Sequence, residues 1–77
     1  MKVLYFAEIK ELVNRSEDVF HFNYAVPVAD LTTLLYQTYP VIQGEKFQVA
    51  INEEFARAED LIQPYDVVAL IPPVSGG

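Results

Sequence analysis

The stretch DVVALIPPVSGG, residues 66–77, decides the fold because it joins an unbroken apolar run to an abrupt stop. Residues 67–71 are all apolar, which is typical of a strand in the middle of a sheet. Pro72 and Pro73 end the run, because proline has no N–H to donate to a β-ladder. We therefore expect a central strand that ends at Ile71, followed by a flexible tail over residues 72–77.

The other continuous apolar run is KVLYFA, residues 2–7, at the opposite end of the sequence. Its β-branched and aromatic residues predict a second strand, and its apolar character suits a central place in a mixed sheet. Directly after it, Ile9, Leu12 and Val13 follow the i, i+3, i+4 spacing of a helix. A short helical turn is therefore predicted over residues 8–13.

Two further segments alternate between apolar and polar residues, as half-buried strands do. They are VFHFNY, residues 19–24, and FQVAIN, residues 47–52. The polar turn NEE that follows the second segment predicts a hairpin with a short strand around residues 55–57.

One substantial helix is predicted after Pro27. The leucines within residues 31–35 recur at helical spacing, and Asp30 suits the first turn because a negative charge is favourable at a helix N-terminus. The helix should end near Tyr39, because Pro40 disfavours the α-conformation of the residue before it.

These elements predict the order strand, strand, helix, strand, strand, strand, with a helical turn after the first strand. The sequence contains no repeat and no internal linker, so residues 1–71 are expected to form a single domain. A mixed sheet of about five strands with one main helix across one face is an α+β roll of the ubiquitin-like, β-grasp kind.

Composition limits the chemistry that this chain can perform. Its 77 residues are 52% hydrophobic and 21% charged, which is typical of one small globular domain. The absence of cysteine excludes disulfides and thiolate metal sites, and a single histidine, His21, argues against a zinc site. We expect no bound metal, and His21 should lie on the polar face of its strand as a surface residue.

The net charge of −6 argues against a nucleic-acid partner, because such binding needs Lys and Arg to neutralise phosphates. No apolar run approaches the ~20 residues of a membrane-spanning helix, and the first residues lack a signal-peptide pattern. We expect a cytoplasmic protein. Its acidic surface either meets a basic partner or serves solubility alone.

The segments KVLYFAEIKEL, VAIN and DVVALIPPVSGG resemble the small, sulfur-carrying subunit of molybdopterin synthase. The resemblance runs the whole length of the chain, and the Pro-Pro-Val, hydroxyl residue and Gly-Gly of the tail are its most specific part. Related sulfur carriers for thiamine synthesis share the fold and the Gly-Gly. They usually lack the Phe-Ala…Glu-Leu opening and the Pro-Pro-Val.

This resemblance implies a reaction at the carboxylate of Gly77, which makes Gly77 the catalytic residue. A separate enzyme, similar to ubiquitin-activating enzymes, would use ATP to adenylate it, and a sulfur donor would convert the adenylate to a thiocarboxylate. The large subunit would then bind the tail, and the sulfur would attack a pyranopterin precursor to build the molybdopterin dithiolene. The resemblance also implies a heterotetramer of two small and two large subunits, and a small subunit that is inert alone and binds no cofactor.

The same resemblance implies the residues that meet the partner. They are the tail residues Pro72, Pro73, Val74, Ser75 and Gly76, and the body residues Phe6, Phe55 and Ile71. Glycine has no Cβ and permits close approach of the backbone at the reacting carbon, and the prolines stiffen the start of the tail. With no cysteine to hold a persulfide, a sulfur carried by this chain has its place at the terminal carbonyl.

Two other functions fit the same tail. A ubiquitin-like modifier would use the same activation chemistry and would join Gly77 to lysines of other proteins. A plain interaction module would end in Gly-Gly by coincidence. The Pro-Pro-Val spacing and the Phe-Ala opening favour the sulfur carrier.

Overall fold

The computed structural model describes residues 1–73. Its helices and strands, in chain order, are β1 (Lys2–Tyr5), α1 (Ala7–Val13), β2 (Glu17–Val19), β3 (Val26–Pro27), α2 (Val28–Thr38), the 3₁₀ helix η1 (Pro40–Ile42), β4 (Gln48–Ile51), β5 (Glu54–Ala56), β6 (Leu61–Ile62) and β7 (Val67–Ile71).

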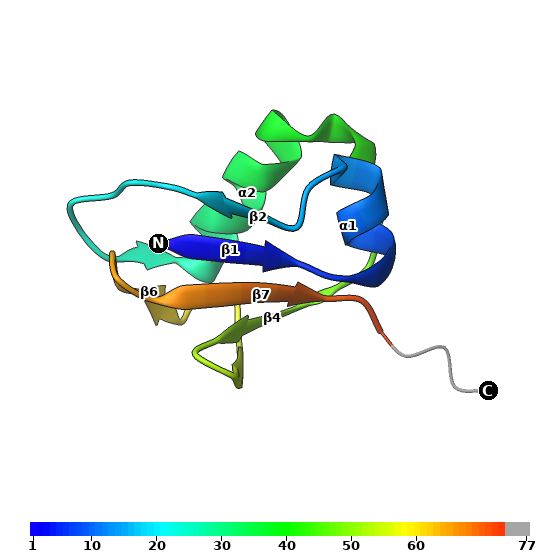
Figure 1. The fold of residues 1–77 in the computed structure, drawn as a ribbon. Helices are drawn as coiled ribbons and strands as arrows, with labels where there is room; N and C mark the ends of the chain where they lie inside the picture. Colours follow the sequence, from blue (N-terminus) through cyan, green and yellow to red (C-terminus); the bar gives the residue numbers. More distant parts are fainter. Residues whose placement is uncertain (74–77) are drawn as a thin grey trace.

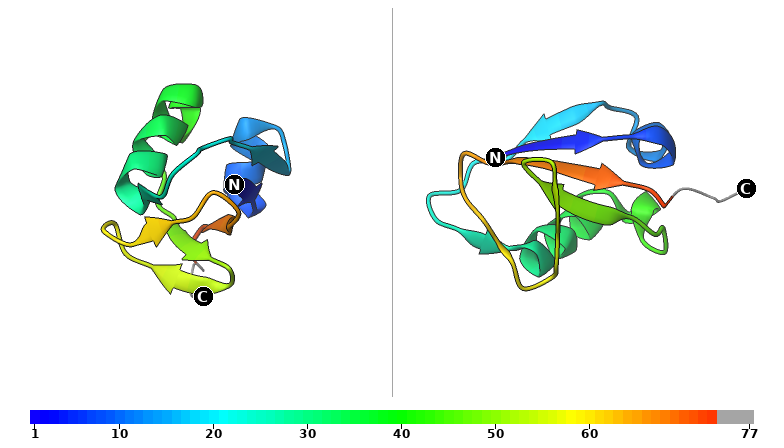
Figure 2. Two further views of the ribbon diagram at one scale, coloured as in Figure 1. Left: turned by 90° about the vertical axis from the view of Figure 1, so that its left-hand side faces the viewer. Right: turned by 90° about the horizontal axis from the view of Figure 1, so that it is seen from below.

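Five of the strands form one mixed sheet in the order β2-β1-β7-β4-β5. β1 and β7 are parallel neighbours, and the other adjacent pairs are antiparallel. β3 and β6 form a separate two-stranded ladder. Helix α2 crosses one face of the larger sheet (Figures 1 and 2). This is the predicted α+β, β-grasp arrangement, with β7 at the centre of the sheet and β1 beside it, as their apolar runs indicated.

The apolar core lies between the sheet and α2. Val68 and Leu70 of β7 are fully buried in the same cluster as Leu31 and Leu35 of α2. The alternate residues of β7 are less buried, because successive side chains of a strand point to opposite faces. The sheet therefore has one face covered by α2 and one open face.

The strand predicted over residues 19–24 is wrong. β2 ends at Val19, which lies opposite Lys2 in β1. Beyond it, Phe20 still exchanges two backbone hydrogen bonds with Met1, and residues 21–24 belong to no strand. The alternation of aromatic and polar residues has another cause: Phe20 and Phe22 are partly buried and pack against the core. His21 is exposed, as predicted.

The two helices were predicted close to their observed bounds. α2 follows Pro27 and ends at Thr38, and Pro40 opens η1 after it. Asn14 ends α1 with a left-handed φ of 59°, and its N–H donates to the carbonyl of Lys10 at 2.9 Å. The short elements η1, β3 and β6 were not predicted, since two or three residues carry no periodic pattern.

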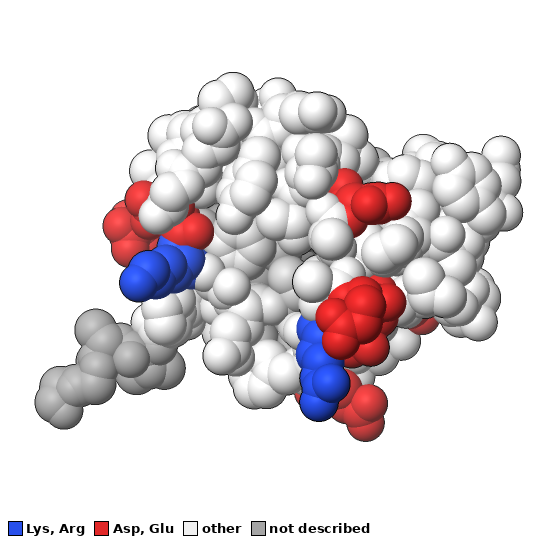
Figure 3. All heavy atoms as spheres, turned by 180° about the vertical axis from the view of Figure 1, so that it is seen from behind, with Lys and Arg blue, Asp and Glu red and all other residues white. Residues whose placement is uncertain are grey.

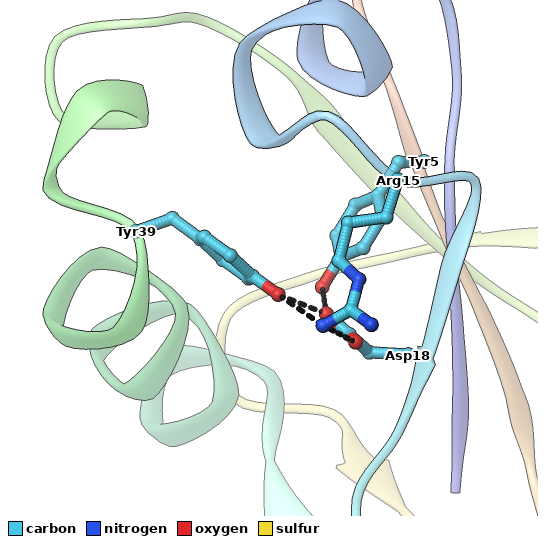
Figure 4. A network of polar contacts seen from close by, with 4 residues as sticks. All are labelled: Tyr5, Arg15, Asp18 and Tyr39. Atoms are coloured by element: carbon cyan, nitrogen blue, oxygen red, sulfur yellow. Dashed lines mark hydrogen bonds and ion pairs between the residues drawn. The ribbon is translucent and has the colours of Figure 1, made fainter.

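A polar cluster joins β2 to β1 and to the end of α2 (Figure 4). The Asp18 carboxylate accepts hydrogen bonds from the hydroxyls of Tyr5, at 2.8 Å, and Tyr39. It also forms an ion pair with Arg15, with Nη1 and Oδ1 2.9 Å apart. Burial, and then the hydrogen bond to Asp18, raise the pKa of Tyr5 well above its usual value.

Candidate docking surface

The open face of the sheet carries an apolar groove of about 600 Å³, called here the open-face groove. Its floor is a row of residues in register across neighbouring strands: Leu4 of β1 lies beside Ala69 of β7, which lies beside Ala50 of β4. The residues that line the groove are Leu4, Phe6, Ala50, Asn52, Glu53, Phe55, Val67, Ala69 and Ile71.

The three body residues predicted to meet a partner, Phe6, Phe55 and Ile71, all line this groove. Phe6 is 45% exposed and Phe55 is 69% exposed, while Ile71 is half-buried. A large aromatic side chain loses much apolar surface from water when it is covered. The structure thus brings the three residues together on a surface suited to burial by another molecule.

Each of these residues is placed by a different element. Phe6 follows β1 directly and has an extended backbone, with φ of −128° and ψ of 153°, and Ala7 after it has a positive φ of 48°. Phe55 lies in the middle of the edge strand β5, opposite Ala50. Ile71 is the last residue of β7.

The chain leaves the sheet at the end of β7 (Figure 1). Ile71, the last residue of that strand, lines the open-face groove. Pro72 is half-buried and Pro73 is exposed, and both stand after the last residue of β7. The other predicted tail positions, Val74, Ser75, Gly76 and Gly77, lie outside the described residues.

Sequence reasoning missed part of the groove. Val67 and Ala69 follow from the period of two along β7, once Val68 and Leu70 are known to face the core. Leu4, Ala50 and Glu53 depend on strand register and on the hairpin turn, which the sequence pattern does not specify.

The turn between β4 and β5, formed by Asn52 and Glu53, places Glu53 at the open-face groove. Asn52 and Glu53 have left-handed φ values of 50° and 72°. Two positive φ values in succession are typical of a type I′ hairpin turn. The side chain of Asn52 holds the turn against β7: its Nδ2 donates to Asp66 at 2.9 Å, and its Oδ1 accepts from the N–H of Val67 at 3.0 Å.

Of the described residues that line the groove, Glu53 alone is charged. Within residues 1–73, no group of three or more His, Asp or Glu side chains is placed to hold a metal ion. The same part of the chain contains no helix long and apolar enough to cross a bilayer. The open-face groove offers an apolar floor, two exposed aromatic side chains and one carboxylate.

A second groove, of about 630 Å³, lies on the α2 side of the sheet between that helix and β4 and β5. Figure 3 views the molecule from behind, and on the side it shows, uncharged residues cover most of the surface and the charged side chains form a few separate groups. Among the predicted partner-binding residues within residues 1–73, Phe55 alone lines this groove as well. The open-face groove is therefore the surface that gathers the predicted residues.

Comparison with known proteins gives matches over nearly the whole chain. The model of the ThiS family matches residues 3–77. The molybdopterin synthase sulfur carrier subunit of Chlamydomonas reinhardtii is 32% identical over 81 residues, an alignment that covers 100% of this chain and 98% of that protein.

Two solved structures share the fold. A putative molybdopterin converting factor, subunit 1, from Pyrococcus furiosus has a TM-score of 0.86 and 23% identity, and the match covers 95% of each chain. SAMP1 from Haloferax volcanii has a TM-score of 0.84 and 26% identity, and the match covers 100% of this chain and 98% of that one. Both likenesses extend across the β-grasp body described above.

Proposed function

The chain belongs to the ThiS family, and on this premise we propose that it is the sulfur carrier subunit of a molybdopterin synthase, acting in molybdenum cofactor biosynthesis in the cytoplasm. The observation that carries the proposal is the open-face groove, which gathers Phe6, Phe55 and Ile71 at the point where the chain continues toward Gly77. Support comes also from the full-length similarity to a molybdopterin synthase sulfur carrier subunit.

In this proposal the carboxylate of Gly77 is the group that carries sulfur. A ubiquitin-activating-like enzyme joins the carboxylate to the AMP portion of ATP and releases pyrophosphate. A donor then supplies sulfur at the oxidation level of sulfide, this sulfur attacks the acyl carbon, and AMP leaves as the C–S bond forms. The resulting thiocarboxylate is an anionic sulfur nucleophile.

The second half of the cycle takes place on the large subunit. The thiocarboxylate sulfur attacks a carbon of the pyranopterin precursor, and an oxygen substituent leaves that carbon as the C–S bond forms. Hydrolysis of the resulting thioester then leaves the sulfur on the pterin and restores the carboxylate of Gly77. Two such transfers supply the two sulfurs of the dithiolene. This chain contributes the carried sulfur and the docking surface, and it needs no bound cofactor for either.

The body positions the tail by docking through the open-face groove. Each exposed aromatic or aliphatic anchor buried in an interface can contribute roughly 2 kcal/mol or more. The six residues from Pro72 to Gly77 reach at most about 20 Å from the end of β7. Docking of the groove therefore restricts where Gly77 can react.

A protein modifier is the second candidate, favoured by the 26% identity to SAMP1, whose name in a further structure is small archaeal modifier protein 1. In that function the activated carboxylate of Gly77 would react with lysine amines of other proteins. A thiamine-type sulfur carrier remains within the same family chemistry, with a different acceptor for the sulfur.

Mass spectrometry of the C-terminal peptide distinguishes a sulfur carrier from a protein modifier. After incubation with ATP, the activating enzyme and a sulfur donor, we expect the peptide to gain the mass of one sulfur in place of one oxygen. The variant that lacks Gly77 is the control. An unchanged peptide, or conjugates to lysine without the sulfur-containing form, would contradict the proposal.

A further inference from the structure

The residue Glu53 occupies a backbone conformation that suits glycine. Its φ of 72° follows the φ of 50° at Asn52, so both central residues of the turn are left-handed. Asparagine tolerates this region, whereas the second position of such a turn strongly favours glycine. The Cβ of Glu53 therefore strains the turn.

The left-handed conformation of the neighbouring Asn52 is accompanied by stabilising side-chain hydrogen bonds to Asp66 and Val67. The side chain of Glu53 makes no such stabilising contact within the described part of the chain. The ion pairs found among residues 1–73 join Lys2 to Glu17, Arg15 to Asp18 and Arg57 to Glu59, and no side-chain hydrogen bond there involves Glu53.

The position of Glu53 in the fold suggests a role in binding for this strained residue. It lies at the rim of the open-face groove, whose other described lining residues are apolar except Asn52. The polar atoms of Asn52 are already engaged. Glu53 is thus the one charged group that a molecule covering the groove would meet.

We propose that Glu53 determines which partner the open-face groove accepts, by pairing with a Lys or Arg side chain that the large subunit presents at the rim. This inference rests on the proposed function, since it takes the large subunit as the docked partner. Covering the groove removes water from the Glu53 carboxylate, and a desolvated carboxylate without a countercharge opposes binding. A partner that lacks the cation is therefore rejected, although the apolar floor would accept it.

The net charge of −6 attracts any basic partner, so the test must separate Glu53 from the overall charge. The adjacent residue Glu54 provides a matched control. It is exposed and carries the same charge, but it lines a different pocket, on the Ile51 and Leu61 side of the hairpin. Glu53→Gln and Glu54→Gln change the net charge equally and leave the backbone without a new steric demand.

The experiment is titration calorimetry of the full chain with the large subunit of molybdopterin synthase from the same organism, at low and high salt. We expect Glu53→Gln to raise the Kd by roughly tenfold at low salt, because truncating one member of an interfacial charge pair leaves the other unpaired. Glu54→Gln should raise it less than about twofold, as rim charges away from the contact do. The dependence of Kd on salt should weaken more for Glu53→Gln than for Glu54→Gln.

A third variant separates binding from folding. Glu53→Gly relieves the strained φ, so it should raise the melting temperature while it weakens binding as much as Glu53→Gln does. A residue with a merely structural role would change stability and binding in the same direction.

Two results would overturn the inference. One is a Kd for Glu53→Gln within twofold of wild type. The other is an equal loss for Glu53→Gln and Glu54→Gln, which would mean that overall charge alone acts. In both cases the wild type still binds the large subunit, so the proposed function stands. Absence of binding by the wild type would reject both together.

Discussion

The side-chain amide of Asn52 and the carboxylate of Asp66 fasten the β4–β5 hairpin to the start of β7: the amide nitrogen donates to Oδ1 at 2.9 Å. The other carboxylate oxygen of Asp66 accepts the N–H of Gln63 at 2.8 Å. Asp66 is only 6% exposed, so each of these hydrogen bonds satisfies a group with little access to water. The pair fixes the rim of the open-face groove relative to its floor.

Removal of this carboxylate should cost stability. Asp66→Ala leaves two donors unpaired, and we expect the free energy of unfolding to fall by roughly 2 kcal/mol. Urea denaturation followed by circular dichroism measures the change. Asp30→Ala is the control, because Asp30 is exposed in the first turn of α2 and its loss should cost about 0.5 kcal/mol. An equal decrease in the free energy of unfolding for the two variants would show that the hydrogen bonds of Asp66 add no stability beyond that of an exposed carboxylate.

The Tyr5–Asp18 contact predicts how stability changes in alkaline solution. The pKa of Tyr5 is raised in the folded protein, first by burial and then by Asp18. As the pH rises above the unfolded value of about 10, the unfolded chain loses this proton and the native state keeps it. The contribution of Tyr5 to the free energy of unfolding is therefore fully present below pH 10. Above pH 10 the free energy of unfolding should fall, by up to about 1.4 kcal/mol per pH unit.

The variant Tyr5→Phe tests the origin of this alkaline loss. Without the hydroxyl, the free energy of unfolding should be lower near neutral pH by about 1 kcal/mol, because the hydrogen bond to Asp18 is missing. The fall above pH 10 should be shallower than in the wild type, in denaturation curves measured between pH 8 and 11. An unchanged slope would assign the alkaline loss to other groups.

Phe55 should contribute to docking and not to folding. Phe55→Asp replaces a side chain that is 69% exposed, so the melting temperature should change little. Its Kd for the large subunit should rise by roughly 30-fold, the equivalent of an anchor worth about 2 kcal/mol. Tyr24→Asp is a matched control, since Tyr24 is an aromatic residue, 68% exposed, that lies outside the open-face groove. Similar losses of binding for both variants would mean that the groove is not the docking site.

Much of the fold could be predicted because its strongest signals are local. The central strands were predicted from the apolar runs of β1 and β7. The main helix was predicted between the prolines that stand before and after α2. The strand prediction failed at residues 20–24 because alternating apolar and polar residues indicate only that a segment is half-buried. A loop that packs on the core has the same pattern. Whether a segment joins a ladder depends on the course of the neighbouring strand in the fold, and the local pattern does not contain that information.

The candidate site was predicted only in part, for a related reason. Phe6, Phe55 and Ile71 came from the resemblance to a family, and the strand register then showed that they share one groove. The role of Asp66 was not predicted, because it depends on a hydrogen bond from Asn52, which is 14 positions away in the sequence. Glu53 looked like an ordinary acidic turn residue, since its positive φ leaves no mark in the sequence.

We further propose that the large subunit binds the tail in a narrow channel, and this predicts that Gly76 affects sulfur transfer separately from docking. Gly76→Val should leave docking of the body largely intact, because the body binds through the open-face groove. Sulfur transfer should fall by about a hundredfold, because a β-branched side chain beside the reacting carbon displaces it by about 1 Å in a channel shaped for glycine. Single-turnover assays with chemically prepared thiocarboxylate measure this step without the activating enzyme. A rate within twofold of wild type would show that no narrow channel contacts this position.

The central claim is that Gly77 delivers sulfur, and one measurement tests it most directly. The chain is prepared chemically with a thiocarboxylate at Gly77 and mixed with the large subunit and the pyranopterin precursor, with no other source of sulfur. We expect dithiolene product to form in a single turnover, with two chains converted from thiocarboxylate to carboxylate for each product. Thiocarboxylate that persists in the presence of bound large subunit and precursor, with no sulfur in the pterin, would contradict the account.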